Sequence, residues 1–220
     1  CVCYIACGSL CAKSAYLLTR WTCIYRGWTL AKNPESVTYG PLLPEHFDAI
    51  IALGNRVQGD GYLNEDNLRT YYELGLLNGI NSGHVTWFNN EIVGFRLTFA
   101  PGKWAIDKWS SPALWGVEPA SVCYFKCNTV DPAMQGFGIG TTLLNLAKQS
   151  AAEQGAKAGL AHIWLASPGN SAFRYFSKNG GELIKEHPNK WREAALYEGY
   201  DCPVCPDTCE CVAAEMLLKF

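Results

Sequence analysis

Apolar residues recur along residues 37–220 with the periods of strands and helices. Strands are predicted at 37–43, 84–88, 91–99, 121–130, 160–166, 182–185 and 212–220. Helices are predicted at 45–57, after the N-cap Asn64, at 141–154 and at 171–179. A crossover helix between two strands makes 121–130 and 160–166 parallel neighbours. The fold class is therefore α+β or α/β in three layers, with a mixed sheet and helices on both faces.

Two predicted strands carry distinct patterns. The strand at 121–130 alternates, which places Cys123, Phe125, Cys127 and Thr129 on one face. The segment 160–166 is almost entirely apolar, as expected of a strand buried on both faces. Between the predicted strands 91–99 and 121–130, residues 100–120 form a long loop with three tryptophans. This loop is interpreted either as a lid over a substrate or as a packed surface loop.

Composition excludes several classes of protein. The 220 residues carry a net charge of −2, which argues against a general nucleic-acid binder. Hydrophobic residues make up 49% and charged residues 17%, which excludes intrinsic disorder. No apolar run reaches the ~18–20 residues of a membrane-spanning helix. Residues 1–36 are predicted to be a cysteine-rich extension, foreign to the domain or the remnant of a longer chain, and the domain itself is predicted to span 37–220.

The segment that carries chemistry is a glycine-rich turn between a predicted strand and helix. Gly136, Gly138 and Gly140 can adopt positive φ and let a ligand approach the main chain. The start of the following helix offers free N–H groups and the positive end of its dipole. Together they predict a cradle for an anion such as a pyrophosphate, with no need for a basic side chain.

Three ligand classes compete for this turn. A dinucleotide fingerprint needs Gly-x-Gly-x-x-Gly, whereas the spacing here is Gly136-x-Gly138-x-Gly140. A nucleoside-triphosphate loop needs a lysine beside the last glycine, and none is present. The acyl-CoA motif Gln/Arg-x-x-Gly-x-Gly/Ala matches from Gln135 onward. A glycine-rich turn without a ligand stays open as an alternative.

The wider context resembles the GCN5-related N-acetyltransferase (GNAT) family. The resemblance covers the strand before the turn, the helix after it, the next buried strand and the segment from Asn170 to Gly180, which is similar to the Asn-x-x-Ala…Tyr-x-x-x-Gly helix of the family. It implies a mixed, mostly antiparallel sheet in which the parallel pair splays apart.

The resemblance also implies how acetyl-CoA, the expected co-substrate, is held. The pantetheine arm would lie along the end of the strand at Val130, Gln135 would shape the cradle, and Asn170 would meet the pantetheine or adenine side. The implied cofactor-binding residues are Val130, Gln135, Gly136, Gly138, Ile139, Gly140, Thr141 and Asn170. A substrate amine would then attack the thioester directly.

This sequence departs from the family pattern at the position of the catalytic acid. Its tyrosine lies four residues before the closing glycine, and that count from Gly180 reaches Phe176. Tyr175 is one position early, which turns a helical side chain by about 100°. Tyr175 is thus the candidate acid, with a core or cleft-wall tyrosine as the alternative. No general base is identified, and His162 is interpreted as a hydrogen-bonded core residue.

Four cysteines cluster near the carboxyl end of the chain. Cys202, Cys205, Cys209 and Cys211 fall within ten residues, and Cys-x-x-Cys is a common half of a zinc site. A structural zinc ion competes with free thiols or local disulfides, and an amino-terminal cysteine is an alternative ligand.

The sequence thus predicts a cytoplasmic acyl-CoA-dependent N-acyltransferase that transfers acetyl to a primary amine. The acceptor is a small-molecule or peptide amine, neither nucleic acid nor membrane is a partner, and a homodimer is left open. The alternative is a non-catalytic CoA-binding or protein-interaction module on the same fold. A dinucleotide oxidoreductase ranks third.

Overall fold

The computed structural model describes residues 36–197, 199, 202, 204, 205 and 208–220. The predicted extension at 1–36 falls, apart from Ser36, outside the described residues, and the predicted domain boundary stays a prediction. Among the described helices, none is long and apolar enough to cross a membrane.

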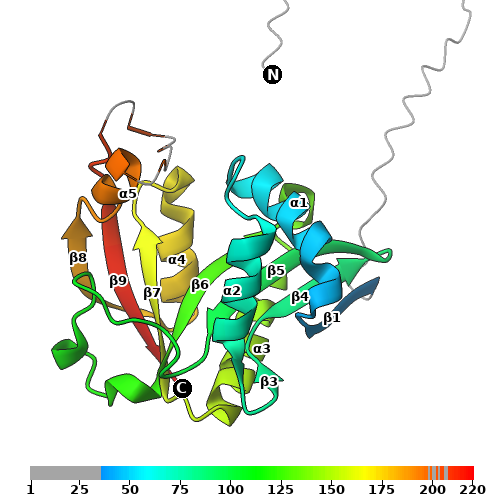
Figure 1. The fold of residues 1–220 in the computed structure, drawn as a ribbon, viewed down its shortest axis with the longest axis horizontal. Coiled ribbons are helices and arrows are strands. Elements are labelled where there is room, and N and C mark those ends of the chain that lie inside the picture. Colours follow the sequence, from blue (N-terminus) through cyan, green and yellow to red (C-terminus); the bar gives the residue numbers. More distant parts are fainter. Residues whose placement is uncertain (1–35, 198, 200–201, 203, 206–207) are drawn as a thin grey trace, which may run out of the picture. The chain divides into compact units, whose positions relative to one another are not determined.

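Seven described strands form one sheet in the order β1-β4-β5-β6-β7-β9-β8 (Figure 1). They are β1 (Val37–Pro41), β4 (His84–Phe88), β5 (Glu91–Phe99), β6 (Val122–Val130), β7 (Ala158–Trp164), β8 (Glu182–Pro188) and β9 (Val212–Lys219). Within this sheet only β6 and β7 pair in parallel. A small hairpin of β2 (Leu76–Leu77) and β3 (Ile80–Asn81), which the sequence patterns did not predict, stands apart from it.

Helices cover both faces of the sheet (Figure 1). α1 (Phe47–Gln58) and α2 (Glu65–Gly75) pack on one face, where Phe47, Ile50 and Leu53 join Phe95 in one buried cluster. α3 (Ile139–Glu153) and α4 (Ser171–Lys178) pack on the other, where Leu144 and Phe176 meet Phe125. The predicted three-layer class and the mixed, mostly antiparallel sheet are confirmed.

The helices begin where local chemistry fixes them. Asn64 caps α2, since its side chain accepts a hydrogen bond from the amide of Asn67. α3 begins at Ile139, two residues earlier than expected, because Gly138 takes a left-handed conformation directly before it. A short helix, α5 (Arg192–Tyr197), lies between β8 and β9 and was missed.

The predicted alternation along β6 is wrong beyond Phe125. A bulge leaves Lys126 without a partner, because Leu97 pairs with Cys127 while Thr98 pairs with Phe125. Cys123 and Phe125 therefore lie in the cluster on the α3 and α4 side, and Cys127 packs on the α1 and α2 side. The extra residue of the bulge reverses the face on which each later side chain of β6 lies.

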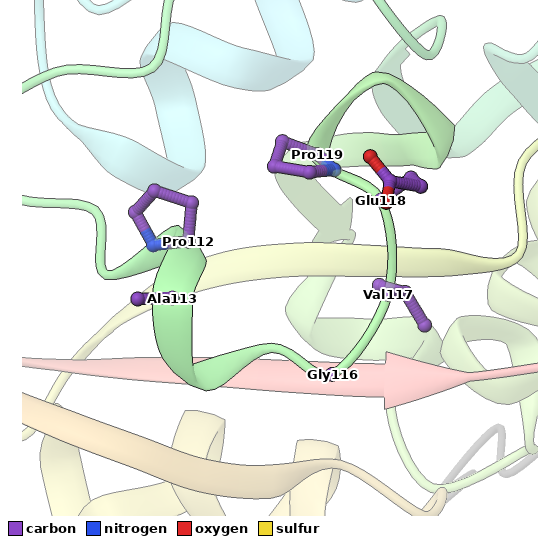
Figure 2. Close-up of a pocket in the computed structure, with 6 residues that line it drawn as sticks. All are labelled: Pro112, Ala113, Gly116, Val117, Glu118 and Pro119. Atoms are coloured by element: carbon purple, nitrogen blue, oxygen red, sulfur yellow. The ribbon is translucent and has the colours of Figure 1, made fainter.

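The loop between β5 and β6 is packed down on the sheet rather than open. Trp115 is completely buried, and the Trp104 indole donates a hydrogen bond of 2.7 Å to the carbonyl of Val122. A hollow of about 630 Å³ opens on the loop itself, lined by Pro112, Ala113, Gly116, Val117, Glu118 and Pro119 (Figure 2). It contains none of the predicted site residues.

Candidate functional site

The parallel strands β6 and β7 separate partway along their length. They pair only from Val122 opposite Ala158 to Tyr124 opposite Leu160, although both strands continue beyond. Figure 1 shows them side by side at one end and diverging toward the end where β6 leads into α3. This edge of β6, from Phe125 to Val130, is thus left without a partner among the described strands. An extended ligand can pair with a main-chain edge of this kind.

The glycine-rich turn follows at the open end of β6. Gly136 and Gly138 have φ of 86° and 78°, and a Cβ built on either meets no atom within 4 Å. The main-chain amides of residues 136–141 donate no hydrogen bond to any described residue, and the first amide of α3 that does is Thr142, to the carbonyl of Gly138 at 3.0 Å. A helix N-terminus with free amides and an open approach is suited to bind phosphate.

Side chains before the turn hold its shape. The Gln135 amide donates to the carbonyl of Val130 at 3.3 Å. The Asp131 carboxylate accepts from the amide of Ala133 at 2.8 Å and forms an ion pair with Arg56 at 2.6 Å. Asp131, one of the acidic residues near this strand, is therefore engaged in the turn and is not a free base.

Tyr175 is the side chain of α4 that reaches the cradle. Its hydroxyl donates to the carbonyl of Gly140 at 2.7 Å, and burial raises its pKa. Phe176, which occupies the family position by count, is buried in the core against Phe125. The shift of one residue along α4 therefore places Tyr175 at the cradle and Phe176 in the core. The role of Tyr175 as the acid stays a prediction.

Arg96 is a residue that the sequence analysis missed. It lies on β5, its side chain is 2% exposed, and its guanidinium carbon is 4.5 Å from the centre of the Phe125 ring. Its Nε and Nη1 have no partner among the described residues, and no described carboxylate lies within ion-pair distance. Burial lowers its pKa. A charged residue inside the apolar strand 92–99 was the signal that could have revealed it.

Two asparagines, Asn128 beside the cradle and Asn170 at the start of α4, are also incompletely bonded. Asn128 is the β6 partner of Arg96, and its amide nitrogen would be 3.0 Å from a Cβ on Gly140. The buried Oδ1 atoms of Asn128 and Asn170 have no partner among the described residues. Because buried polar atoms are nearly always bonded in folded proteins, these two oxygens have the capacity to accept hydrogen bonds from water or from a ligand. The free amides and the unpartnered atoms together fit an acyl-CoA.

Comparison with known proteins agrees with this geometry. The family model described as "Acetyltransferase (GNAT) family" matches residues 60–180, more than half of the chain. The chain belongs to the GNAT acetyltransferase family. The match includes the predicted cradle and extends to the end of α4. A comparison with curated sequences gives no match.

Solved GNAT structures share the fold at low sequence identity. The yncA protein of Salmonella typhimurium, solved with its cofactor acetyl-CoA, is 18% identical, with a TM-score of 0.60 over 84% of this chain and 94% of that one. Naa50 of Arabidopsis thaliana, in complex with the bisubstrate analogue CoA-Ac-MVNAL, is 16% identical, with a TM-score of 0.57 over 84% and 99%. The ribosomal-protein-S18-alanine N-acetyltransferase of Escherichia coli is 14% identical, with a TM-score of 0.58 over 83% and 93%.

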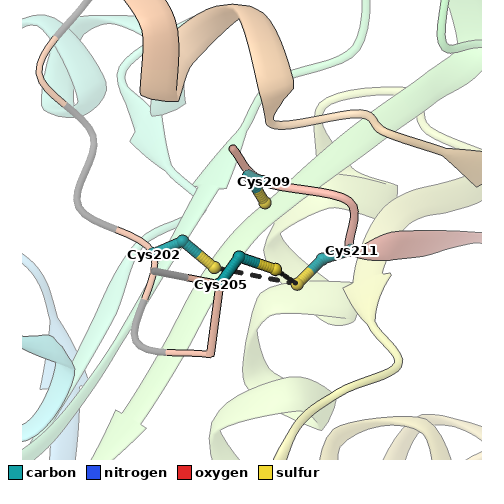
Figure 3. Close-up of side chains that lie close together, drawn as sticks. All are labelled: Cys202, Cys205, Cys209 and Cys211. Atoms are coloured by element: carbon teal, nitrogen blue, oxygen red, sulfur yellow. Dashed lines mark hydrogen bonds between the residues drawn. The ribbon is translucent and has the colours of Figure 1, made fainter. Parts of the chain in front are cut away.

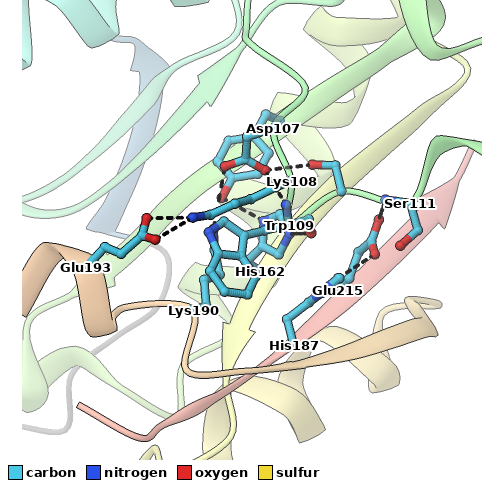
Figure 4. Close-up of polar contacts among 11 residues, drawn as sticks. Asp107, Lys108, Trp109, Ser111, His162, His187, Lys190, Glu193 and Glu215 are labelled. Carbon is cyan, nitrogen blue, oxygen red and sulfur yellow. Dashed lines mark hydrogen bonds and ion pairs between the residues drawn. The ribbon is translucent and has the colours of Figure 1, made fainter. Parts of the chain in front are cut away.

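A second polar group of this GNAT domain centres on Glu215 of β9 (Figure 4). The carboxylate is completely buried and accepts from the Ser111 amide at 2.7 Å, the Trp115 indole at 2.7 Å and His187 at 2.8 Å. Burial alone would raise its pKa, but these hydrogen bonds outweigh burial and lower it. Glu215 ties the long loop and β8 to β9.

His162 of β7 lies beside this group with both ring nitrogens engaged. Nε2 is 2.6 Å from the carbonyl of Trp109, so it carries the hydrogen, and Nδ1 is 3.2 Å from the hydroxyl of Tyr124. Burial, reinforced by Lys190, lowers its pKa to about 4. The interpretation of His162 as hydrogen-bonded is confirmed, but its side chain is half-buried and does not lie in the core.

The four predicted cysteine ligands come together in the connection from β8 to β9 (Figure 3). All four are unbridged, and Cys202, Cys209 and Cys211 are buried. Burial raises the pKa of Cys211 to about 12. At Cys202 burial also opposes ionisation, but hydrogen bonds with the main chain of Val204 and Cys205 lower its pKa to about 7. The amino-terminal cysteines lie outside the described residues.

Proposed function

We propose that this protein is an acetyl-CoA-dependent N-acetyltransferase that transfers acetyl to a primary amine. The observation that carries the proposal is the set of free amides at 136–141, placed where β6 and β7 diverge. The yncA structure, solved with its cofactor acetyl-CoA, supports the choice of co-substrate.

The main chain supplies most of the binding. The amides of Gly136 to Thr141 would hold the diphosphate, helped by the positive end of the α3 dipole. The unpaired edge of β6 at Val130 would hydrogen-bond the pantetheine amides, and the Oδ1 of Asn170 would accept from the same arm. Gln135 would keep the end of the strand in place through the Val130 carbonyl.

When bound, acetyl-CoA supplies an activated acetyl thioester. Arg96 places a positive charge beside the cradle, where burial strengthens its field. Such a charge favours the negative charge that develops on oxygen and sulfur during acyl transfer. Tyr175, whose hydroxyl donates to the carbonyl of Gly140 and which lies within electrostatic reach of Arg96, would help to protonate the departing thiolate.

No side chain is proposed as the general base. Asp131 is paired with Arg56, Glu215 accepts three hydrogen bonds, and His162 has both nitrogens engaged. We therefore infer that the amine binds in its neutral form and attacks the thioester carbonyl. The nitrogen then releases its extra proton to solvent. A peptide amine is supported by two similar structures: Naa50 was solved with the peptide-containing analogue CoA-Ac-MVNAL, and the Escherichia coli enzyme is named for an alanine of ribosomal protein S18. A small-molecule amine is the other acceptor class. A cytoplasmic location is part of the same proposal.

Calorimetry with acetyl-CoA tests the cradle through two matched glycine substitutions. Gly138 and Gly155 both have left-handed φ with open space around them, but only Gly138 lies in the cradle. Either glycine replaced by valine should lower the free energy of unfolding by about 1–2 kcal/mol. Only Gly138→Val should weaken acetyl-CoA binding, by about 10-fold or more, because its side chain occupies the space of the diphosphate.

Equal affinities in the two variants, or no binding to the wild-type chain, would discard the pocket. Turnover separates the enzyme from the non-catalytic alternative. Release of free CoA from acetyl-CoA, measured with a panel of peptide and small-molecule amines, is expected for the enzyme. Binding with no turnover for any amine would favour a CoA-binding module.

A further inference from the structure

The thiols of Cys202, Cys205, Cys209 and Cys211 have the spacing of a metal site. All four Sγ atoms lie within 4.8 Å of one another. Cys211 Sγ is 3.7 Å from both Cys202 Sγ and Cys205 Sγ. Four sulfurs around one zinc ion at about 2.3 Å stand about 3.8 Å apart at the corners of a tetrahedron. Figure 3 shows the four side chains directed toward one another.

Free thiols alone give little reason for such a cluster. Thiols are weak hydrogen-bond donors and acceptors, so their mutual contacts add little stability. The buried Cys202, Cys209 and Cys211 could serve either as small apolar core residues or as ligands of a shared ion. Small apolar residues would not need four sulfurs directed at one another. In two disulfides the sulfurs would pair off, whereas Cys211 contacts two thiols at equal distance.

We propose that these four cysteines bind one Zn²⁺ ion in a closed, structural tetrathiolate site. Each cysteine contributes one thiolate to the ion and releases its proton to solvent. Four protein ligands leave no open position, so the ion takes no part in the acetyl transfer. The set is complete without a cysteine from residues 1–36. This inference does not rest on the proposed function.

The site sits where the ion can fix the connection from β8 to β9. The cluster packs against Trp164 at the end of β7, Trp191 directly before α5 and Ala195 within α5. The carbonyl of Cys211 accepts from the amide of Asn189 at 3.1 Å. In the same connection, Glu193 pairs with Lys108 of the long loop at 2.6 Å. A metal at this site would hold α5 and the Glu193–Lys108 ion pair against the sheet. Exposed ion pairs alone contribute little to stability.

Metal analysis of the full chain tests the proposal. The protein is purified under reducing conditions without chelator, and zinc is measured by mass spectrometry. We expect about one equivalent in the wild type and a small fraction of this in Cys209→Ser, which loses a thiolate ligand. Cys127→Ser, a thiol outside the cluster, is the matched control and should keep the zinc. A variant with serine at Cys1, Cys3, Cys7, Cys11 and Cys23 should also keep it.

A second measurement covers the case in which Cys209→Ser does not fold. Wild-type protein stripped of metal and refilled with Co²⁺ should show the strong visible absorption of tetrahedral cobalt thiolate, and chelation should lower the thermal midpoint of unfolding. Zinc well below one equivalent, iron in its place, two disulfides in the native mass, or loss of zinc from the amino-terminal variant would each overturn the assignment.

Discussion

Two groups of buried polar side chains lie on this sheet, and they differ in how completely they are bonded. The group around Glu215 is fully partnered: both carboxylate oxygens accept hydrogen bonds, and both nitrogens of His162 are engaged. Around Arg96, by contrast, two guanidinium nitrogens and the Oδ1 atom of its strand partner Asn128 have no partner among the described residues.

We interpret this as a difference between side chains that hold the fold and side chains that would bind a ligand. An unpartnered buried polar atom costs about 1–3 kcal/mol, so several near one cradle are a stability cost that a ligand would relieve. A fully bonded group has no capacity left for a substrate. Substitution in the Glu215 group should therefore act on stability, whereas substitution in the Arg96 group should act on binding and turnover.

The largest effect is expected from Glu215→Ala. The substitution leaves the Ser111 amide, the Trp115 indole and His187 without an acceptor in a buried site. The free energy of unfolding, measured by urea denaturation, should fall by about 3–5 kcal/mol. Glu65→Ala, which removes an exposed ion pair with Arg69, is the control and should cost about 0.5 kcal/mol or less. A loss under about 1 kcal/mol at Glu215 would break the distinction.

Arg96→Met should show the opposite behaviour. Methionine keeps much of the length of arginine and removes a buried charge that has no carboxylate partner, so the free energy of unfolding should stay within about 1 kcal/mol of wild type. Loss of the charge beside the cradle should lower kcat/KM for acetyl-CoA by about 10- to 100-fold. Arg69→Met, on the surface of α2, should change neither. A large loss of stability with unchanged kcat/KM would place Arg96 with the structural group.

The sequence predicted the cradle and most of the sheet because both depend on local pattern. The turn, its glycines and the start of α3 are contiguous from Val130 to Thr141, and backbone preference alone defines them. Strand and helix periods are local as well. The one-residue shift of Tyr175 from the family position was also visible in the sequence, because it follows from counting residues back from Gly180.

The remaining features depend on contacts that no local pattern contains. Glu215 meets Ser111 across 104 residues, and their pairing depends on how the long loop packs on β9. The bulge at Lys126 depends on the register between β5 and β6 and is invisible in an alternating sequence. The charge of Arg96 within the apolar segment 92–99 is visible in the sequence, but its burial without a carboxylate partner is a property of the folded core. The short helix α5, with six residues, is below the length at which helical periodicity is reliable.

The smallest expected effect is a pH dependence that belongs to His162. Its folded pKa of about 4 is below the unfolded value of about 6.5, so its contribution to stability is complete above about pH 6.5 and is lost as pH falls toward 4. Urea denaturation across this range should show a fall that is smaller by about 1–2 kcal/mol in His162→Gln than in wild type. His46, His84 and Glu215, whose pKa values are also lowered, are present in both proteins, so the difference reports mainly on His162. Identical pH profiles would mean that His162 accepts a proton freely in the fold, which would move it from the bonded group to the candidates for a general base.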